Sequence, residues 1–140
     1  IKFFLHTNQS GICRKMFSLE DVNLCNKTIL NILKNKYFVD LNIEKFFIAP
    51  SFDSIYRKPT NRVVCELENN YNLQKKNILY IGDTLVDFNT AIESDTKCII
   101  YRGYAAKPID EELNIEGRYI AHNDLELLDK VTHFIDAGND

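Results

Sequence analysis

The sequence has few of the residues that break up secondary structure. Only five Gly and three Pro occur among its 140 residues, and no Ser-, Gly- or Pro-rich linker or internal repeat divides it. With 45% hydrophobic and 26% charged residues, its composition is that of a folded domain. Collagen-like, low-complexity and disordered chains are therefore excluded. A chain of this length predicts a single domain over residues 1–140.

Long hydrophobic runs are also missing. No stretch approaches the ~20 apolar residues that a membrane-spanning helix needs, and no basic segment precedes an apolar one as in a secretory signal. The net charge of −3 provides no overall basic field for non-specific nucleic-acid binding. We therefore expect an intracellular protein, cytoplasmic or nuclear and not secreted, with no membrane partner. The oligomeric state is left open.

The cysteines do not form a metal-binding pattern. None of the four belongs to a C-x-x-C pair, and the three histidines form no cluster with them, so we expect no zinc site. Cys25 and Cys65 fall at helical spacing and Cys98 lies in an apolar run. These three are therefore expected to be buried free thiols.

Short apolar runs alternate with helical patterns along the chain. Strands are expected at residues 2–6, 45–49, 77–81, 97–101 and 118–121. Continuous apolar strands separated by helices are typical of a parallel sheet covered on both faces. The fold class predicted is therefore α/β, with a doubly wound, Rossmann-like parallel sheet.

The helical patterns have recognisable starts. Ser18 and Asp21 have the spacing of a capping box for a helix reaching about Tyr37. Pro59 is expected at the first position of a second helix, and Asp124 as the cap of the last one. The apolar positions expected to face inward are Val22, Cys25, Ile29, Ile32 and Leu33 in the first helix, Val63, Val64 and Leu67 in the second, Val86, Ala91 and Ile92 in the third, and Leu125, Leu128, Val131 and Ile135 in the last.

Ligand sites of such folds lie beyond the carboxyl ends of the strands. Asp83 follows an apolar strand, and Asp87 comes four residues later. Magnesium prefers oxygen ligands and needs only one or two protein carboxylates, so the pair suits this cation. A second interpretation is that Asp83 caps the following helix and Asp87 is solvated in its first turn.

Two further segments follow strands. Thr7, Asn8 and Gln9 offer a hydroxyl, amides and backbone N–H groups that can bind phosphate oxygens, or they form a polar turn. Arg57 and Lys58 offer a guanidinium and an ammonium that can stabilise a phosphoryl group, or they are surface residues.

The order of these three segments resembles that of a known family. TNQSG after a strand, RKP before a helix and ILYIGDTLVD after another strand are similar to motifs of the haloacid dehalogenase-like phosphatases. The resemblance spans about residues 2–101. It is strongest to the branch of histidinol-phosphate and heptose-bisphosphate phosphatases and of polynucleotide kinase-phosphatases.

The resemblance implies a role for each site residue. Thr7 and Asn8 would bind phosphate with Gln9 beside them, and Lys58 would neutralise the phosphoryl group. Arg57 would reach substrate or phosphate. Asp83 would complete Mg²⁺ coordination, and Asp87 would join or orient that metal shell or would orient Lys58.

The family's nucleophile is missing. In this family an Asp of a D-x-D motif on a central strand attacks phosphorus and forms an aspartyl-phosphate, which water then hydrolyses. No D-x-D occurs in the sequence, so the resemblance implies a sheet whose first central strand is absent from this chain. We therefore expect an N-terminally truncated phosphatase domain that, as given, does not turn over. A non-catalytic binding domain on the same scaffold is the alternative, and a phosphoacceptor receiver domain is disfavoured by the order of Lys58 and Asp83.

The substrate expected is a phosphomonoester, with polynucleotide 3′-phosphates favoured. Residues 40–56 contain no Cys or His, unlike the zinc loop of many small-metabolite phosphatases, and APSFDSIYRKP resembles the polynucleotide 3′-phosphatases. That resemblance implies a nucleic-acid 3′ end as partner and a role in DNA repair. Phe52 and Tyr56 could stack on a terminal base, or they are packed loop aromatics. The fourth motif, GDTLVDFNTAIES, favours a sugar or histidinol phosphate instead.

Overall fold

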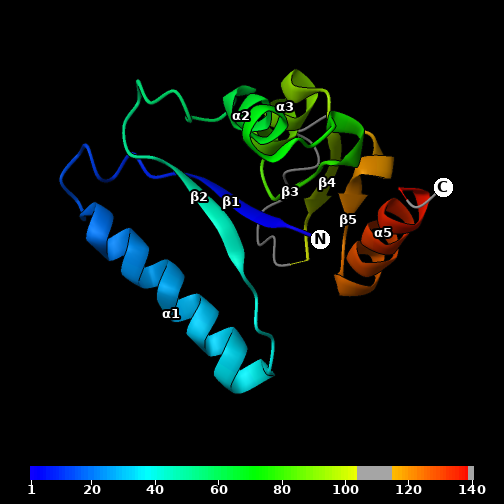
Figure 1. Cartoon of the computed structure of the whole chain (residues 1–140), viewed down its shortest axis with the longest axis horizontal. Coiled ribbons are helices and arrows are strands. Elements are labelled where there is room, and N and C mark those ends of the chain that lie inside the picture. The colour runs from blue at the N-terminus through cyan, green and yellow to red at the C-terminus, as the bar shows by residue number, and fades with distance from the viewer. Residues whose placement is uncertain (104–114, 139–140) are drawn as a thin grey trace. The chain divides into compact units, whose positions relative to one another are not determined.

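The computed structural model describes residues 1–103 and 115–138. The chain divides into two compact units, Ile1–Lys58 and Pro59–Asp140, and each contains a parallel sheet, with one helix in the first unit and several in the second (Figure 1). The α/β class with parallel strands, predicted from the sequence, is therefore confirmed. Within the described ranges the strands form two separate sheets.

The first unit is built around one strand pair. Strand β1 (Phe3–Asn8) runs parallel to β2 (Ile43–Ala49), with Asn8 opposite Ala49 at the carboxyl end. Phe47 and Ala49 of β2 are fully buried. The strand expected to end at His6 continues for two more residues, so Thr7 and Asn8 belong to β1 and not to a turn.

Helix α1 (Leu19–Tyr37) connects the two strands and begins as predicted. The Ser18 hydroxyl accepts from the Asp21 N–H, and the Asp21 carboxylate accepts from the Ser18 N–H, which confirms the capping box. The predicted inward side is wrong at Cys25, Ile29 and Ile32, which are exposed. The side of the helix that is turned away from solvent is instead formed by Val22, Asn26, Leu30 and Leu33, which are spaced four, four and three residues apart.

The second unit contains three parallel strands in the order β3, β4, β5. These are β3 (Leu79–Gly82), β4 (Lys97–Tyr101) and β5 (Ile120–Ala121). The bounds of β4 are those predicted, whereas β3 starts later than expected because Lys75–Asn77 form the 3-10 helix η1. Cys98, Ile99 and Ile100 are buried, which confirms the expectation for Cys98.

Helix α2 (Arg62–Tyr71) starts three residues after Pro59, so the predicted start at Pro59 is wrong. The backbone N–H and C=O of Lys58 bond to the Asn8 side chain and do not enter a helix. The Thr60 hydroxyl accepts from the Arg62 N–H at the true start. Its predicted apolar side is confirmed, because Val63, Val64 and Leu67 are buried.

Helices α3 (Leu85–Ser94) and α5 (Asp124–Ala137) bury less apolar surface than predicted. In α3, Ala91 is buried as expected, but Val86 and Ile92 are exposed because Asp87, Thr90 and Ser94 take the inner positions. In α5, Leu125 and Leu128 are exposed. The cap of α5 is Asn123 and not Asp124, and the Asn123 side chain accepts from the Glu126 N–H.

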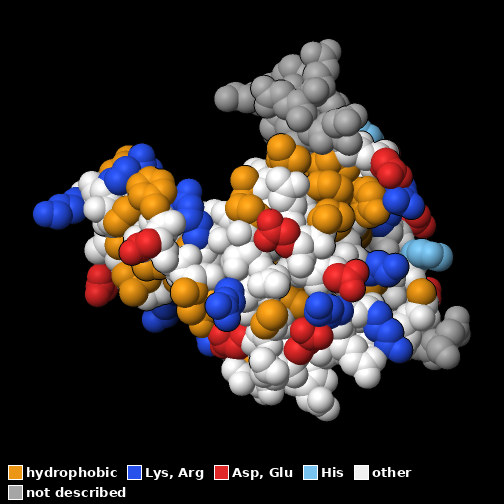
Figure 2. Space-filling view, turned by 90° about the horizontal axis from the view of Figure 1, so that it is seen from above, with side chains coloured by type: hydrophobic (Ala, Val, Ile, Leu, Met, Phe, Trp, Pro, Cys, Tyr) orange, Lys and Arg blue, Asp and Glu red, His pale blue; other side chains and the backbone are white. Residues whose placement is uncertain are grey.

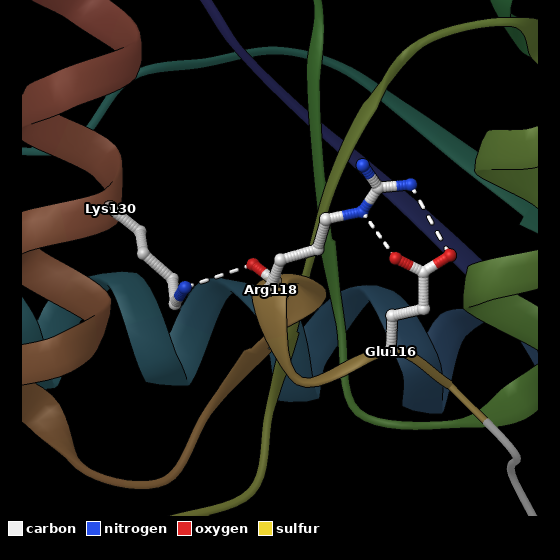
Figure 3. Close-up of polar contacts among 3 residues, drawn as sticks. All are labelled: Glu116, Arg118 and Lys130. Atoms are coloured by element: carbon white, nitrogen blue, oxygen red, sulfur yellow. Dashed lines mark hydrogen bonds and ion pairs between the residues drawn. The ribbon is translucent and has the colours of Figure 1, made fainter.

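Polar contacts attach α5 to the 3-10 helix η2 (Gly117–Tyr119), which leads into β5. The Arg118 guanidinium bonds to the Glu116 carboxylate, with Nε 2.8 Å from Oε2 (Figure 3). The Lys130 ammonium of α5 donates to the Arg118 carbonyl at 2.9 Å. The side chain and the backbone carbonyl of Arg118 are therefore both bonded, which fixes the segment that leads into β5.

The surface mixes charged and apolar groups. Acidic and basic side chains are interleaved over much of the face shown in Figure 2, with hydrophobic side chains between them. None of the helices in the described ranges has both the length and the apolarity that crossing a membrane requires. Of the cysteines expected to be buried, Cys25 is exposed and Cys65 is half-buried.

Candidate functional site

The carboxyl end of β1 presents three polar side chains. Thr7, Asn8 and Gln9 are all half-buried. The Gln9 backbone N–H donates to the Ala49 carbonyl at 2.8 Å, and the Gln9 amide donates to the Thr7 hydroxyl at 3.0 Å. The Thr7 hydroxyl is therefore fixed by its neighbour while it keeps its own proton to donate.

Asn8 holds the main chain of Lys58. The Asn8 Oδ1 accepts from the Lys58 N–H at 2.8 Å, and the Asn8 Nδ2 donates to the Lys58 carbonyl at 3.1 Å. Both polar atoms of the amide are engaged in this pair of bonds. The structure thus brings the first and second predicted segments together within one unit, although they are 50 residues apart.

The segment between β2 and Lys58 is anchored by Tyr56. The Nε2 atom of His6 lies 2.6 Å from the Tyr56 carbonyl oxygen. The Tyr56 ring packs edge-on against Phe47, with centroids 5.3 Å apart. Tyr56 therefore serves as a packing residue in this unit, and the predicted stacking of its ring on a base is not favoured by its position.

Arg57 lies against Phe52 in the same segment. Its guanidinium carbon is 4.7 Å from the centre of the Phe52 ring, a cation–π distance. Phe52 is 60% exposed, so much of the ring remains accessible. The Arg57 Nη1 atom is buried and has no hydrogen-bond partner among the residues that the structure describes. A donor of this kind is suited to an anionic oxygen.

The second unit holds the two candidate carboxylates. Asp83 is exposed directly after β3, whereas Asp87 is 3% exposed in the first turn of α3. The Asp87 Oδ2 atom accepts from the N–H groups of Asp83 and Thr84, both at 3.1 Å, and from the Thr84 hydroxyl at 2.7 Å. The helix cap is therefore Thr84 and not Asp83, and Asp87 is a buried capping-box residue and not a solvated one.

Gly82 allows this arrangement. A Cβ added at position 82 would lie 2.3 Å from the Asp87 Cβ and 2.4 Å from its Cγ. Only glycine leaves room for the buried carboxyl group, so the Gly-Asp dipeptide after β3 has a steric cause.

The buried Asp87 carboxylate affects its neighbours in the sheet. Burial, with a smaller contribution from Asp87, raises the pKa of the Cys98 thiol to about 12. Burial, followed by Asp87 and Cys98, raises the pKa of Tyr80 well above its ordinary value. Both groups stay protonated at neutral pH, so Cys98 is a poor nucleophile.

Two residues that contact the candidate segments, one in each unit, were not predicted from the sequence. Arg102 directly follows β4, and its Nη1 donates to the Asp83 carbonyl at 2.9 Å. The rule that site residues follow strands applies to Arg102 as well and could have identified it. His6 lies inside β1, and no sequence signal distinguishes it from an ordinary strand residue.

The donors for a magnesium ion form a partial set. Within residues 1–103 and 115–138, no group of three or more His, Cys, Asp or Glu side chains is arranged to bind a metal. Asp83 offers an exposed carboxylate, which fits a cation that retains several waters. Asp87 has one oxygen committed to three donors, so its contribution as a direct ligand stays a prediction.

A family comparison identifies the chain. Residues 1–109 match the family described as polynucleotide kinase 3 phosphatase. The chain belongs to this family. The resemblance to haloacid dehalogenase-like phosphatases, based on the three motifs, is thereby confirmed.

Two individual proteins are also similar to the chain. The chain is 29% identical over 99 residues to the D-glycero-alpha-D-manno-heptose-1,7-bisphosphate 7-phosphatase of Campylobacter jejuni, covering 69% of the chain and 55% of the relative. It thus spans little more than half of that protein. The crystal structure of D,D-heptose 1.7-bisphosphate phosphatase from B. bronchiseptica, complexed with magnesium and phosphate, matches with a TM-score of 0.75. At 18% identity, over 94% of this chain and 74% of the other, that match shows a shared fold.

Proposed function

We propose that this chain forms part of a magnesium-dependent phosphomonoester hydrolase that acts through an aspartyl-phosphate. The observation that carries the proposal is the pair of hydrogen bonds between Asn8 and the main chain of Lys58. They join the TNQ segment to the RKP segment in one unit. The hydroxyl of Thr7 and the cations of Arg57 and Lys58 thus belong to two segments that are bonded to each other, which supports a role in phosphoryl binding.

Each residue has a defined task in this proposal. The Thr7 hydroxyl donates to a phosphoryl oxygen, and the Lys58 ammonium offsets the charge of the phosphoryl group and of the attacking carboxylate. Asp83 contributes an oxygen ligand to Mg²⁺, and Asp87 supports the backbone on which Asp83 lies. When bound, Mg²⁺ neutralises charge on the phosphoryl oxygens.

The nucleophile comes from outside this sequence in the proposal. Because the chain has no D-x-D motif and spans 55% of its curated relative, we assign the nucleophilic and acid–base aspartates to further sequence of the same protein. The single phosphatase domain would be complete only with them. Activity is therefore tested on the full-length protein.

The substrate favoured is a nucleic-acid 3′-phosphate. The exposed Phe52 ring beside Arg57 supports this choice, because it pairs a stacking surface with a cation next to Lys58. The family's description points the same way. A role in DNA repair would follow from this substrate.

A sugar phosphate is the second candidate. It is supported by the two heptose-bisphosphate phosphatases that the chain resembles. Rates of phosphate release from a 3′-phosphorylated oligonucleotide and from a heptose bisphosphate, measured on the same preparation, would distinguish the two substrates.

Turnover of a generic aryl phosphate with Mg²⁺ tests the activity itself. The full-length protein is expected to release phosphate, and Lys58→Ala and Asp83→Asn are expected to abolish release. Unchanged rates in both variants would refute the assignment. An inactive full-length protein that still binds phosphate would support the non-catalytic binding domain.

A further inference from the structure

Two side chains of β1 hold the segment that ends in Lys58. His6 and Asn8 are two positions apart on the strand, so their side chains leave it on the same face. The His6 Nε2 contacts the Tyr56 carbonyl at 2.6 Å, and Asn8 makes its two bonds to Lys58. The main chain is thus fixed on both sides of Arg57.

His6 is the donor in its contact. A carbonyl oxygen carries lone pairs and no proton, so the hydrogen of this bond belongs to Nε2. The bond forms with the neutral Nε2–H tautomer and also with the protonated ring.

Packing adds a third attachment. The Tyr56 ring lies edge-on against Phe47, which is fully buried in β2. The Arg57 N–H donates to the Ser54 carbonyl at 2.9 Å, which closes the turn that precedes the segment. The main chain of residues 56–58 is thus already ordered, so little conformational entropy is lost when an anion binds.

We propose that His6 is a positioning residue for the Arg57 and Lys58 side chains, acting through the Tyr56 carbonyl. This inference rests on the proposed function, because it assumes that Lys58 acts on the phosphoryl group. A cation whose backbone shifts by about 1 Å loses much of its effect, up to about 100-fold in rate. His6 touches no substrate atom in this proposal and contributes only placement.

The test compares two substitutions in the full-length protein. His6→Phe keeps a planar ring and removes the donor, whereas His6→Gln keeps an N–H at a similar reach. With an aryl phosphate and Mg²⁺, we expect kcat of His6→Phe to fall roughly 10- to 100-fold with a smaller change in KM. His6→Gln is expected to restore most of kcat.

Phe4→Leu is the matched control. Phe4 shares the strand face with His6 and packs near Phe47, with centroids 6.4 Å apart, but takes no part in the two anchoring contacts. The Phe4→Leu variant removes packing contacts in the same sheet and is expected to retain kcat. Equal kcat losses in His6→Phe and Phe4→Leu, or failure of His6→Gln to recover, would overturn the proposal.

Amide hydrogen exchange separates this proposal from the proposed function. The Lys58 N–H is protected by its bond to Asn8, and His6→Phe is expected to speed its exchange while His6→Gln leaves it slow. If Lys58→Ala retains turnover, the proposed function fails, and unchanged Lys58 exchange in His6→Phe independently refutes the anchoring role.

Discussion

The Asp87 carboxylate accepts a hydrogen bond from the backbone N–H of Asp83, with 3.1 Å between the two atoms. The same oxygen also accepts from the N–H and the hydroxyl of Thr84. One member of the acidic pair is thus a buried support for the other, which is exposed. The two carboxylates are expected to respond differently to substitution.

Asp87→Ala should lower the free energy of unfolding by about 2 kcal/mol, because it removes a capping box and leaves three donors unsatisfied. Asp83→Ala should change it by less than about 0.5 kcal/mol, since its side chain is exposed. Urea unfolding measures both values. Asp87→Asn is the control, because it keeps an acceptor and should lose less than Asp87→Ala. Equal losses at positions 83 and 87 would contradict the division of roles.

Gly82→Ala should destabilise the protein by about 1–3 kcal/mol. The added methyl would lie 2.3 Å from the Asp87 Cβ, so either β3 or α3 has to move. Gly117→Ala is the matched control, since an added Cβ there meets nothing within 4 Å. Thermal unfolding of the two variants, followed by circular dichroism, compares them. A wild-type midpoint for Gly82→Ala would show that the site is looser than described.

Phe38→Gly should stabilise the protein by about 1 kcal/mol. Phe38 ends α1 with φ of 58°, a left-handed conformation that strains a residue with a Cβ. It is also 90% exposed, so little packing is lost. Asn72, which ends α2 with φ of 52°, is the control, because asparagine tolerates this conformation and Asn72→Gly should change stability little. Chemical unfolding of both variants provides the comparison.

Stability should fall as the pH rises from about 9 towards 12. The pKa of Cys98 rises from 9.0 to about 12 on folding, so the unfolded chain loses this proton first. By proton linkage, the free energy of unfolding is highest below pH 9 and decreases through this window. Tyr80 adds to the slope because its pKa is raised in the same direction. Urea titrations at several pH values should show a shallower slope for Cys98→Ala, whereas Cys13→Ala, at an exposed thiol, should match the parent.

Phe52→Ala should weaken the binding of a 3′-phosphorylated oligonucleotide. Loss of one stacking surface should reduce the binding free energy by about 1–3 kcal/mol, which corresponds to roughly a 5- to 150-fold rise in KM for the oligonucleotide. An aryl phosphate should be hydrolysed with little change in KM. Ile55→Ala removes a neighbouring exposed side chain, 64% accessible against 60% for Phe52, and is the control. Similar KM changes for both substrates would argue against a nucleic-acid substrate.

Much of the fold followed from local patterns in the sequence. The capping box of Ser18 and Asp21 and the apolar run of β4 depend on neighbouring residues, so they were predictable and are confirmed. The start of α2 could not be predicted in this way, because the Lys58 main chain is bonded to the side chain of Asn8, 50 residues earlier. The predicted inward face of α1 was wrong at Ile29, which is exposed, because helical spacing alone does not reveal which side of the helix is covered.

The candidate site shows the same division. Strand-end positions made Thr7, Asn8, Lys58 and Asp83 candidates, because the geometry of parallel sheets is general. The tasks of Asn8 and Asp87 were not evident, since each depends on hydrogen-bond partners that only tertiary structure supplies. His6 gave no signal, because a histidine in a strand has many ordinary explanations.

The contact between Gly82 and Asp87 couples the choice of amino acid at two positions. Residue 82 can acquire a side chain without a shift of β3 or α3 only if residue 87 is also glycine, because the nearest clash is with the Asp87 Cβ, and a glycine at position 87 leaves Asp83 and Thr84 without their acceptor. The two positions are therefore expected to covary during evolution. A library that randomises them separately would find few functional variants, whereas one that randomises them jointly would sample compensated pairs.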